Sequence, residues 1–445
     1  MPLFSWSRWK SERPQAGTLN EEVDRLAASS RVHGLFEWFN RHEREIADFQ
    51  LAITAVPAPP FGEQARAAWL GERLSLLGLA TSTDAAGNLL AARPGVHNEA
   101  PAVALSAHLD TVFPATTPLH VRRDQARLLG PGISDNGSGL AALYALAAAF
   151  HECGIVTATP LLFVANVGEE GEGNLRGMRH LYRKHAAAAA VSVVRDEDPA
   201  PSIAQLIALD GAGDENIISQ ALGSRRFEVV ITGPGGHSWS DHGIPNPIVA
   251  AAFAIDALFR VPLPVHPRTT LNIGSIQGGT SINTIPECAV FKVDFRSSEP
   301  ACLNELEQHL RRAVAEACKE TEAGSAARVR LNHSIAVVGE RPAGELPEGS
   351  PLLAAARAVD THLGIRSQIL RASTDANIPL SLGLEAVSLG SGGTGGGAHT
   401  VNEWFDPAGR AQGLKRLTLL ILLLAGISAA DAAPAPVPDN SQEQG

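Results

Sequence analysis

The chain has 445 residues, of which 44% are hydrophobic and 19% are charged. This composition is typical of a globular protein with a large core, and the length suggests two or three domains. The net charge of −11 argues against a nucleic-acid partner, because non-specific binding requires a basic surface. The four cysteines form no C-x-x-C pair, which argues against a disulfide scaffold and favours a cytoplasmic location.

Neither end of the chain contains a candidate membrane segment. Residues 1–30 form an N-terminal extension that lacks the apolar stretch of a signal peptide. The longest apolar run, 417–427, is far shorter than the roughly 20 residues that cross a membrane, so it predicts a buried helix. Residues 431–445 are rich in proline and polar residues and are expected to be disordered.

Buried strands and amphipathic helices alternate along most of the chain. Apolar runs typical of buried parallel strands lie at 102–108, 160–169, 205–210 and 386–390, and helical patterns lie at 138–150 and 350–363. This alternation predicts an α/β fold with a mainly parallel sheet. We expect this domain to be discontinuous, formed by 31–220 and 337–430.

The segment 221–336 has a different order of elements and is interpreted as an inserted domain. Its strands are expected at 226–232, 270–276, 289–297 and 328–334, and its helices at 246–259 and 301–320. The order β-α-β-β-α-β is that of a ferredoxin-like unit.

Polar residues stand at the carboxyl ends of several predicted strands, where α/β sheets bind ligands. His108 ends the first run and is followed by Asp110, on the same side of the chain. His108 could bind a metal while Asp110 holds its other ring nitrogen, although a histidine satisfied by local hydrogen bonds is the simpler interpretation. Asp135, in GPGISDNGSG, is either a turn or N-cap residue or a carboxylate that bridges two metals about 3.5–4 Å apart.

Adjacent carboxylates follow the second predicted strand. Burying Glu169 and Glu170 is unfavourable unless a cation or proton compensates them, so one could bind a metal and the other act as general base. The alternative is a solvated acidic turn. Asp210 ends the third run and is a further candidate ligand, with Asp196 and Asp198 as rivals.

Two more histidines lie in glycine-rich turns. His237, in GPGGHS, projects from the tip of a turn in the inserted domain, which favours an interaction role. His399 follows a glycine run whose residues 390–395 match G-x-G-x-x-G. A dinucleotide site is weakly indicated, because no clear helix opens there and the acidic residue about 20 positions later is missing. The motifs of single-zinc H-E-x-x-H peptidases and of serine hydrolases are absent from the sequence.

Taken in order, these motifs resemble the co-catalytic zinc peptidases and deacylases, a family that includes peptidase T, carboxypeptidase G, acetylornithine deacetylase and succinyl-diaminopimelate desuccinylase. The matching pieces are SAHLDTVFP, GPGISDNGSG, NVGEEGEGN, ALDG, GPGGHS, GGTSINTIPECAVFKVDFR and GGGAHTVNE. They extend from residue 106 to residue 403, which is most of the chain.

The resemblance implies two Zn²⁺ per subunit, with Co²⁺ or Mn²⁺ as alternatives. His108 and Asp210 would bind one ion, Glu170 and His399 the other, and Asp135 would bridge both. Asp110 would orient His108, and Glu169 would be the general base for a water bridging the zinc ions. His237 would reach the active site of a partner subunit in a homodimer, and Arg296 and Asn283 would contact substrate. The gap between Glu170 and Asp210 is longer than the family's pattern leads us to expect.

The resemblance therefore implies a hydrolase that cleaves an amide bond in small peptides, with di- or tripeptides as substrates. An N-acyl-amino-acid deacylase is the alternative within the same family. A homologue that has lost catalysis and only binds small molecules would lack the base or a ligand, yet every candidate position here carries a competent residue. The motifs do not distinguish a peptide from an N-acyl amino acid.

Overall fold

The computed structural model describes residues 16–185, 202–325 and 329–427. The chain divides into two compact units, one formed by Met1–Gln220 with Glu345–Gly445 and the other by Ala221–Gly344. The second unit therefore extends beyond the expected boundary at 336. Its last strand, β14 (Asn332–Arg341), begins later than the expected strand 328–334, and that prediction was wrong.

The first unit is built on a mixed sheet whose centre is parallel. The strand order is β1-β2-β6-β3-β7-β17-β8-β15, with β16 paired to β8. Strands β6, β3, β7 and β17 are parallel neighbours, whereas β2 and β8 pair antiparallel at the flanks. The bounds are β1 Ala80–Thr83, β2 Leu89–Arg93, β3 Ala102–His108, β6 Leu161–Asn166, β7 Ile203–Leu209, β8 Asn216–Ala221, β15 Gly344–Glu345, β16 Gln368–Ala372 and β17 Glu385–Leu389. The predicted α/β class with a mainly parallel sheet is confirmed.

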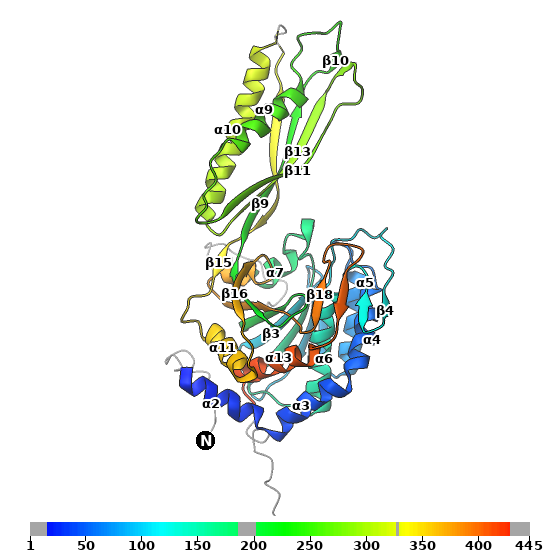
Figure 1. Cartoon of the computed structure of the whole chain (residues 1–445), viewed down its shortest axis with the longest axis vertical. Helices are drawn as coiled ribbons and strands as arrows, with labels where there is room; N and C mark the ends of the chain where they lie inside the picture. The colour runs from blue at the N-terminus through cyan, green and yellow to red at the C-terminus, as the bar shows by residue number, and fades with distance from the viewer. Residues whose placement is uncertain (1–15, 186–201, 326–328, 428–445) are drawn as a thin grey trace, which may run out of the picture. The chain divides into compact units, whose positions relative to one another are not determined.

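Helices cover this sheet because its central strands are buried on both faces. Every residue of β3 and β6 is buried, as their unbroken apolar runs predict. Helices α6 and α13 both pack on β3 and on each other (Figure 1). The bounds are α2 Ala16–Ala27, α3 Ser30–Arg41, α4 Glu43–Thr54, α5 Gln64–Leu76, α6 Gly137–Glu152, α7 Arg176–Leu181, α11 Pro351–Leu363, α12 Asn377–Ser381 and α13 Arg410–Ala425.

The first and last described helices, α2 and α13, pack within the first unit. Helix α2, in the predicted N-terminal extension, packs against α11 and α13. The apolar run at 417–427 lies largely in α13, which is buried. None of the helices in the described parts of the chain has the length and apolar character needed to cross a membrane. The expected disordered tail, 431–445, lies outside the described residues.

A small antiparallel sheet lies beside the main one, in the order β18-β19-β5-β4. Its strands are β4 Arg122–Asp124, β5 Arg127–Leu129, β18 Thr394–Gly396 and β19 Trp404–Asp406. The G-x-G-x-x-G match at 390–395 runs into strand β18, and no helix begins there. The structure therefore contradicts the dinucleotide interpretation, which requires a helix N-terminus for the phosphates.

The second unit has the predicted β-α-β-β-α-β order. Its sheet order is β11-β13-β9-β14, and both helices pack on the face formed by Phe227, Phe291 and Phe295. The bounds are β9 Gly223–Thr232, α9 Pro247–Phe259, β11 Thr269–Gly278, β13 Cys288–Ser297 and α10 Pro300–Ala323, followed by β14. A two-stranded sheet, β10 Gly236–His237 with β12 Thr284–Ile285, is added to this ferredoxin-like arrangement.

Candidate metal centre

His108 is the last residue of β3 and is 1% exposed. Its Nδ1 lies 2.9 Å from the backbone oxygen of Asp110, and its Nε2 lies 3.0 Å from Oδ1 of Asp135. The ring is thus fixed by a backbone carbonyl and not chiefly by the Asp110 carboxylate, whose Oδ1 is 3.8 Å from Nδ1. This geometry corrects the expected contact, because β3 ends at His108 and Asp110, which lies beyond the strand, turns its backbone carbonyl toward the ring.

The Asp110 carboxylate instead holds the adjacent acidic turn. Its Oδ1 accepts the backbone N–H of Glu169 at 3.0 Å and its Oδ2 accepts that of Glu170 at 2.7 Å. Both glutamates are buried, at 5% and 7% exposure. The alternative of a solvated acidic turn is therefore wrong.

A second contact supports the same turn. Gly168 has φ 65°, and a Cβ there would lie 2.7 Å from the Arg176 side chain. Arg176 Nη2 donates to both carboxylate oxygens of Glu63 at 2.7 Å, and Glu63 is fully buried. The turn carrying Glu169 is thus fixed from two directions.

Asp135 is placed by the N-cap of α6. The cap is Asn136, whose Oδ1 accepts from Gly139 N at 3.1 Å and whose Nδ2 donates to Leu209 O at 2.8 Å. A Cβ on Gly139 would lie 2.7 Å from that same carbonyl oxygen, so only glycine permits this approach. The helix start therefore lies against the end of β7 and brings Asp135 near Asp210.

The two oxygens of Asp135 face two different imidazoles. Oδ1 is 3.0 Å from His108 Nε2, and Oδ2 is 3.2 Å from His399 Nε2. Asp210 Oδ1 lies 3.9 Å from the His108 nitrogen, and Glu170 Oε1 lies 2.9 Å from the His399 nitrogen. The five predicted ligand residues thus form two groups that share one carboxylate. His399 has φ 64°, a left-handed conformation that is uncommon outside glycine and clusters at functional sites.

The raised pKa values of residues in the cluster indicate that its carboxylates lack neighbouring positive charge. Burial and the charge of Asp135 raise the pKa of Asp210 to about 7. Hydrogen bonds to Asp135 and Glu170 raise the pKa of His399 to about 10. Burial opposes protonation of His108, but its hydrogen bond to Asp135 outweighs this and raises its pKa well above the ordinary value. His399 therefore carries a proton at neutral pH, and the protonated form of His108 is favoured where it faces Asp135.

The donor set fits divalent cations. Imidazole nitrogens with carboxylate oxygens are ligands that Zn²⁺ accepts, and ligand atoms around a tetrahedral ion at about 2.0–2.1 Å lie roughly 3.3 Å apart. The contacts of 3.0 and 3.2 Å from Asp135 to the two imidazoles, and of 2.9 Å from Glu170 to His399, are close to that separation. One atom each from His108, Asp135 and Glu170 also lies within 4.8 Å of the others.

Three buried residues near the centre were missed at the level of sequence. Glu403 is fully buried, and its carboxylate accepts three backbone N–H groups of the Asp135 loop. Burial raises its pKa to about 7, against the effect of those N–H groups. Arg66 donates to the backbone oxygens of Leu109, Thr54 and Val56, and Asp375 accepts from the Asn166 amide at 2.8 Å. The only sequence signal was the position of Glu403, four residues after His399.

The residues predicted in the inserted domain fall into two places within the second unit. His237 is exposed and pairs with Thr284 between β10 and β12, and the next residue, Ser238, donates its N–H to the Asn283 oxygen at 3.0 Å. His237 and Asn283 are therefore close together. Arg296 pairs with Ser224 at the opposite end of β13, where its Nε lies 2.7 Å from Asp294 Oδ2. The rivals Asp196 and Asp198 lie outside the described residues.

A pocket of about 350 Å³ adjoins the cluster. It is lined by Asp135 and Asp210 together with small uncharged residues, namely Ser134, Gly211, Ala212, Gly213, Thr394, Gly395, Gly396 and Ala398. A larger open hollow of about 590 Å³ between α5 and β1 contains none of the candidate site residues. The smaller pocket is therefore the one associated with the chemistry.

Several known proteins are similar to this chain. A probable carboxypeptidase from Aspergillus terreus is 30% identical over 240 residues, which are 51% of each chain, so the chain spans about half the length of that relative. The uncharacterized protein YqjE of Bacillus subtilis is 26% identical over 328 residues, 72% of this chain and 79% of its own.

Solved structures share the fold. A tripeptidase from Staphylococcus aureus has a TM-score of 0.68 at 21% identity, covering 86% of this chain and 98% of its own. Human carnosine dipeptidase 1 has a TM-score of 0.67 at 13% identity, covering 88% of this chain and 99% of its own. The model of peptidase family M20/M25/M40 matches residues 104–423, well over half of the sequence, and the chain therefore belongs to that family.

Proposed function

We propose that this protein hydrolyses the amide bond of small peptides, such as di- or tripeptides, with two divalent cations, Zn²⁺ by preference, in the cluster around Asp135. The observation that carries the proposal is the division of the Asp135 oxygens between His108 and His399. A carboxylate shared in this way suits two neighbouring cations. His108 and Asp210 would hold one cation, and Glu170 and His399 the other.

The bound cations would supply Lewis-acid polarisation of the scissile carbonyl and a more acidic water. Glu169, buried beside the cluster, accepts a proton from the attacking water and delivers it to the leaving nitrogen. The Asp110 carboxylate accepts the backbone N–H of Glu169 and so fixes the position of that residue, which makes Asp110 a positioning residue. The small pocket lined by glycine and alanine suits a small substrate group.

We further propose that the chain works as a homodimer and that His237 stabilises the oxyanion in the partner subunit's active site. The outer side of α9 supports association, because Val249, Phe253 and Phe259 are 39%, 40% and 62% exposed. Asn283 and Arg296 are proposed substrate contacts, with Asn283 beside His237. The four free cysteines support the proposed cytoplasmic location.

The test uses the full chain, stripped of metal with a chelator and then reloaded with Zn²⁺, Co²⁺ or Mn²⁺. We expect metal-dependent cleavage of di- and tripeptides in a panel that also contains N-acyl amino acids. Activity confined to N-acyl amino acids would eliminate the peptidase assignment and favour a deacylase.

A matched pair of variants tests the base. Glu169→Gln should lower kcat about 10²–10⁴-fold while metal binding is retained. Glu172→Gln, an exposed acid in the same segment, should leave kcat unchanged. Near-normal hydrolysis by Glu169→Gln would show that another group takes the proton.

A further inference from the structure

Glu403 makes an unusual set of hydrogen bonds for a buried acid. Its Oε1 accepts the backbone N–H groups of Ser134 and Asp135, each at 2.7 Å, and its Oε2 accepts that of Gly132 at 2.9 Å. The residue is 0% exposed, and within the described residues its carboxylate makes no ion pair. An unpaired buried carboxylate is unfavourable unless its oxygens are satisfied, so these three donors account for its presence.

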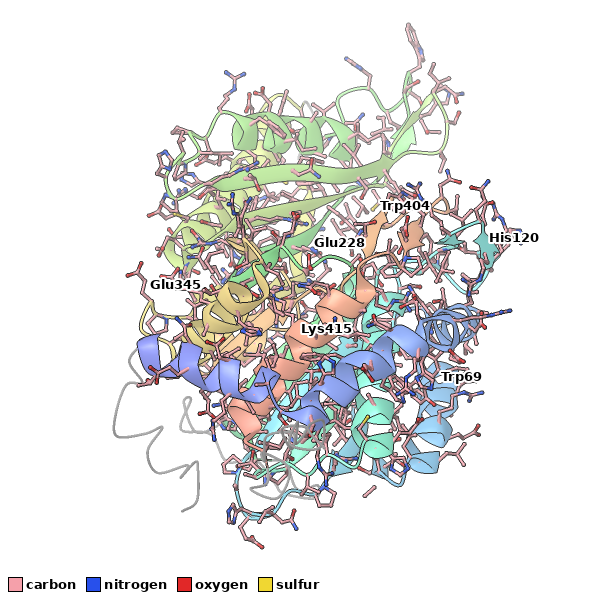
Figure 2. The ribbon with its side chains drawn as sticks, turned by 60° about the horizontal axis from the view of Figure 1, so that its bottom comes forward. Trp69, His120, Glu228, Glu345, Trp404 and Lys415 are labelled. Carbon is pink, nitrogen blue, oxygen red and sulfur yellow. The ribbon has the colours of Figure 1, made fainter. Side chains whose placement is uncertain are left out.

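The backbone of Glu403 joins the same loop to the segment that carries His399. Its carbonyl accepts Gly130 N–H at 3.0 Å, and its own N–H donates to Thr400 O at 3.2 Å. The next residue, Trp404, begins β19 and pairs with Leu129 of β5; it is labelled in Figure 2. Glu403 therefore contacts both segments that converge on the metal centre.

We propose that Glu403 is a positioning residue that fixes the loop 132–135, and that it thereby directs the two Asp135 oxygens toward His108 and His399. The inference rests on the proposed metal site. It extends that proposal by assigning cation affinity to a side chain that is not a ligand. Outer groups that orient ligands commonly change metal affinity about 10–100-fold when they are replaced.

The geometry explains why a carboxylate is required. Both oxygens of Glu403 face N–H donors, so each must accept. A glutamine has one oxygen and one NH₂ group, and in either orientation its NH₂ opposes at least one backbone N–H. Glu403→Gln therefore keeps the volume of the side chain and removes part of the hydrogen bonding to the loop.

The experiment measures cation binding by metal-free protein, using Zn²⁺ and Co²⁺ titrations without substrate. Glu403→Gln should weaken cation binding about 10–100-fold relative to the unaltered protein. Saturating metal should bring kcat back to within a few-fold, with KM little changed. Hydrogen exchange at the amides of Gly132, Ser134 and Asp135 should become faster, whereas amides of β3 should remain protected.

Glu385→Gln is the matched control. Its carboxylate accepts Ser350 Oγ at 2.6 Å and Leu352 N–H at 3.1 Å at the start of α11, and it lies at the other end of β17 from the centre. This variant should lose some stability and keep its cation affinity. Equal cation affinities for the Glu403→Gln and unaltered proteins would overturn the proposal. It would also be overturned if Glu385→Gln lost as much cation affinity as Glu403→Gln.

If Glu403→Gln does not fold, hydrogen exchange of the unaltered metal-free protein tests the proposal instead. The three loop amides should exchange as slowly as buried strand amides, and rapid exchange would overturn the inference. A failure of the proposed function is distinguishable, because an unaltered protein that binds no divalent cation refutes the metal site, while the amide measurement still reports on the hydrogen bonds of Glu403.

Discussion

Cation binding to the metal-free protein is expected to release at least about one and a half protons at pH 7, because ligands must be deprotonated. His399 has a pKa of about 10 and is protonated at this pH. Asp210, with a pKa of about 7, is half protonated, and the raised pKa of His108 can only add to the release. His399 thus contributes about one proton and Asp210 about half of one.

The pH dependence follows from these values. Above pH 8 Asp210 is already ionised, so the release should fall by about half a proton, and below pH 6 it should rise by about half a proton. Apparent affinity should therefore rise steeply with pH from 6 to 8 and then less steeply.

Isothermal titration in buffers of different ionisation enthalpy counts the protons directly. His399→Gln should reduce the count by about one. His333→Gln, on exposed β14 of the second unit, should leave it unchanged. Release of less than one proton at pH 7 would refute the reasoning, since it would mean that both imidazoles are neutral before the metal arrives.

Three further predictions concern stability. Asp360 and Arg416 form a buried pair with contacts of 2.6 and 2.8 Å, so Asp360→Asn should lower the free energy of unfolding in urea by about 3–5 kcal/mol. Replacing both residues, as Asp360→Leu with Arg416→Met, should recover most of this loss. A loss below about 1 kcal/mol for Asp360→Asn would contradict the prediction. Phe291→Ala should destabilise the second unit by about 3–5 kcal/mol in calorimetry and leave cation affinity unchanged; an equal effect on the first unit would contradict the division into units. The raised pKa of His399 contributes stability that is fully present below pH 6.5 and is lost as pH rises through about 10, so the Tm of the metal-free protein should fall across that range; a Tm that rises there would have the wrong sign.

The fold was largely predictable from sequence, since its central strands are continuous apolar runs. β3 matches the expected run at 102–108, and α6, α9 and α11 lie within a residue or two of the expected helices. The final strand of the second unit was misplaced. β14 pairs with β9 through an irregularity between Val337 and Gly339, which breaks the alternation that marks a strand in sequence.

The proximity of the candidate ligands was predictable from the sequence, but the hydrogen bonds that hold their loops in place were not. His108, Asp210 and the acidic turn follow strands whose carboxyl ends meet at one edge of the sheet. The hydrogen bonds of Asp110 and Glu403 go to backbone N–H groups, which carry no side-chain signature in a sequence. Whether a carboxylate contacts an imidazole or a backbone amide depends on loop conformation, so only the structure separates a ligand from a residue that positions one.

Metal stoichiometry of the full chain tests the central claim most directly. After gentle purification and reloading, the protein should bind two divalent cations per chain, and Asp135→Ala should reduce this number and abolish peptide hydrolysis. Retention of full activity after complete removal of metal, or failure of the reloaded protein to bind any divalent cation, would contradict the two-cation account.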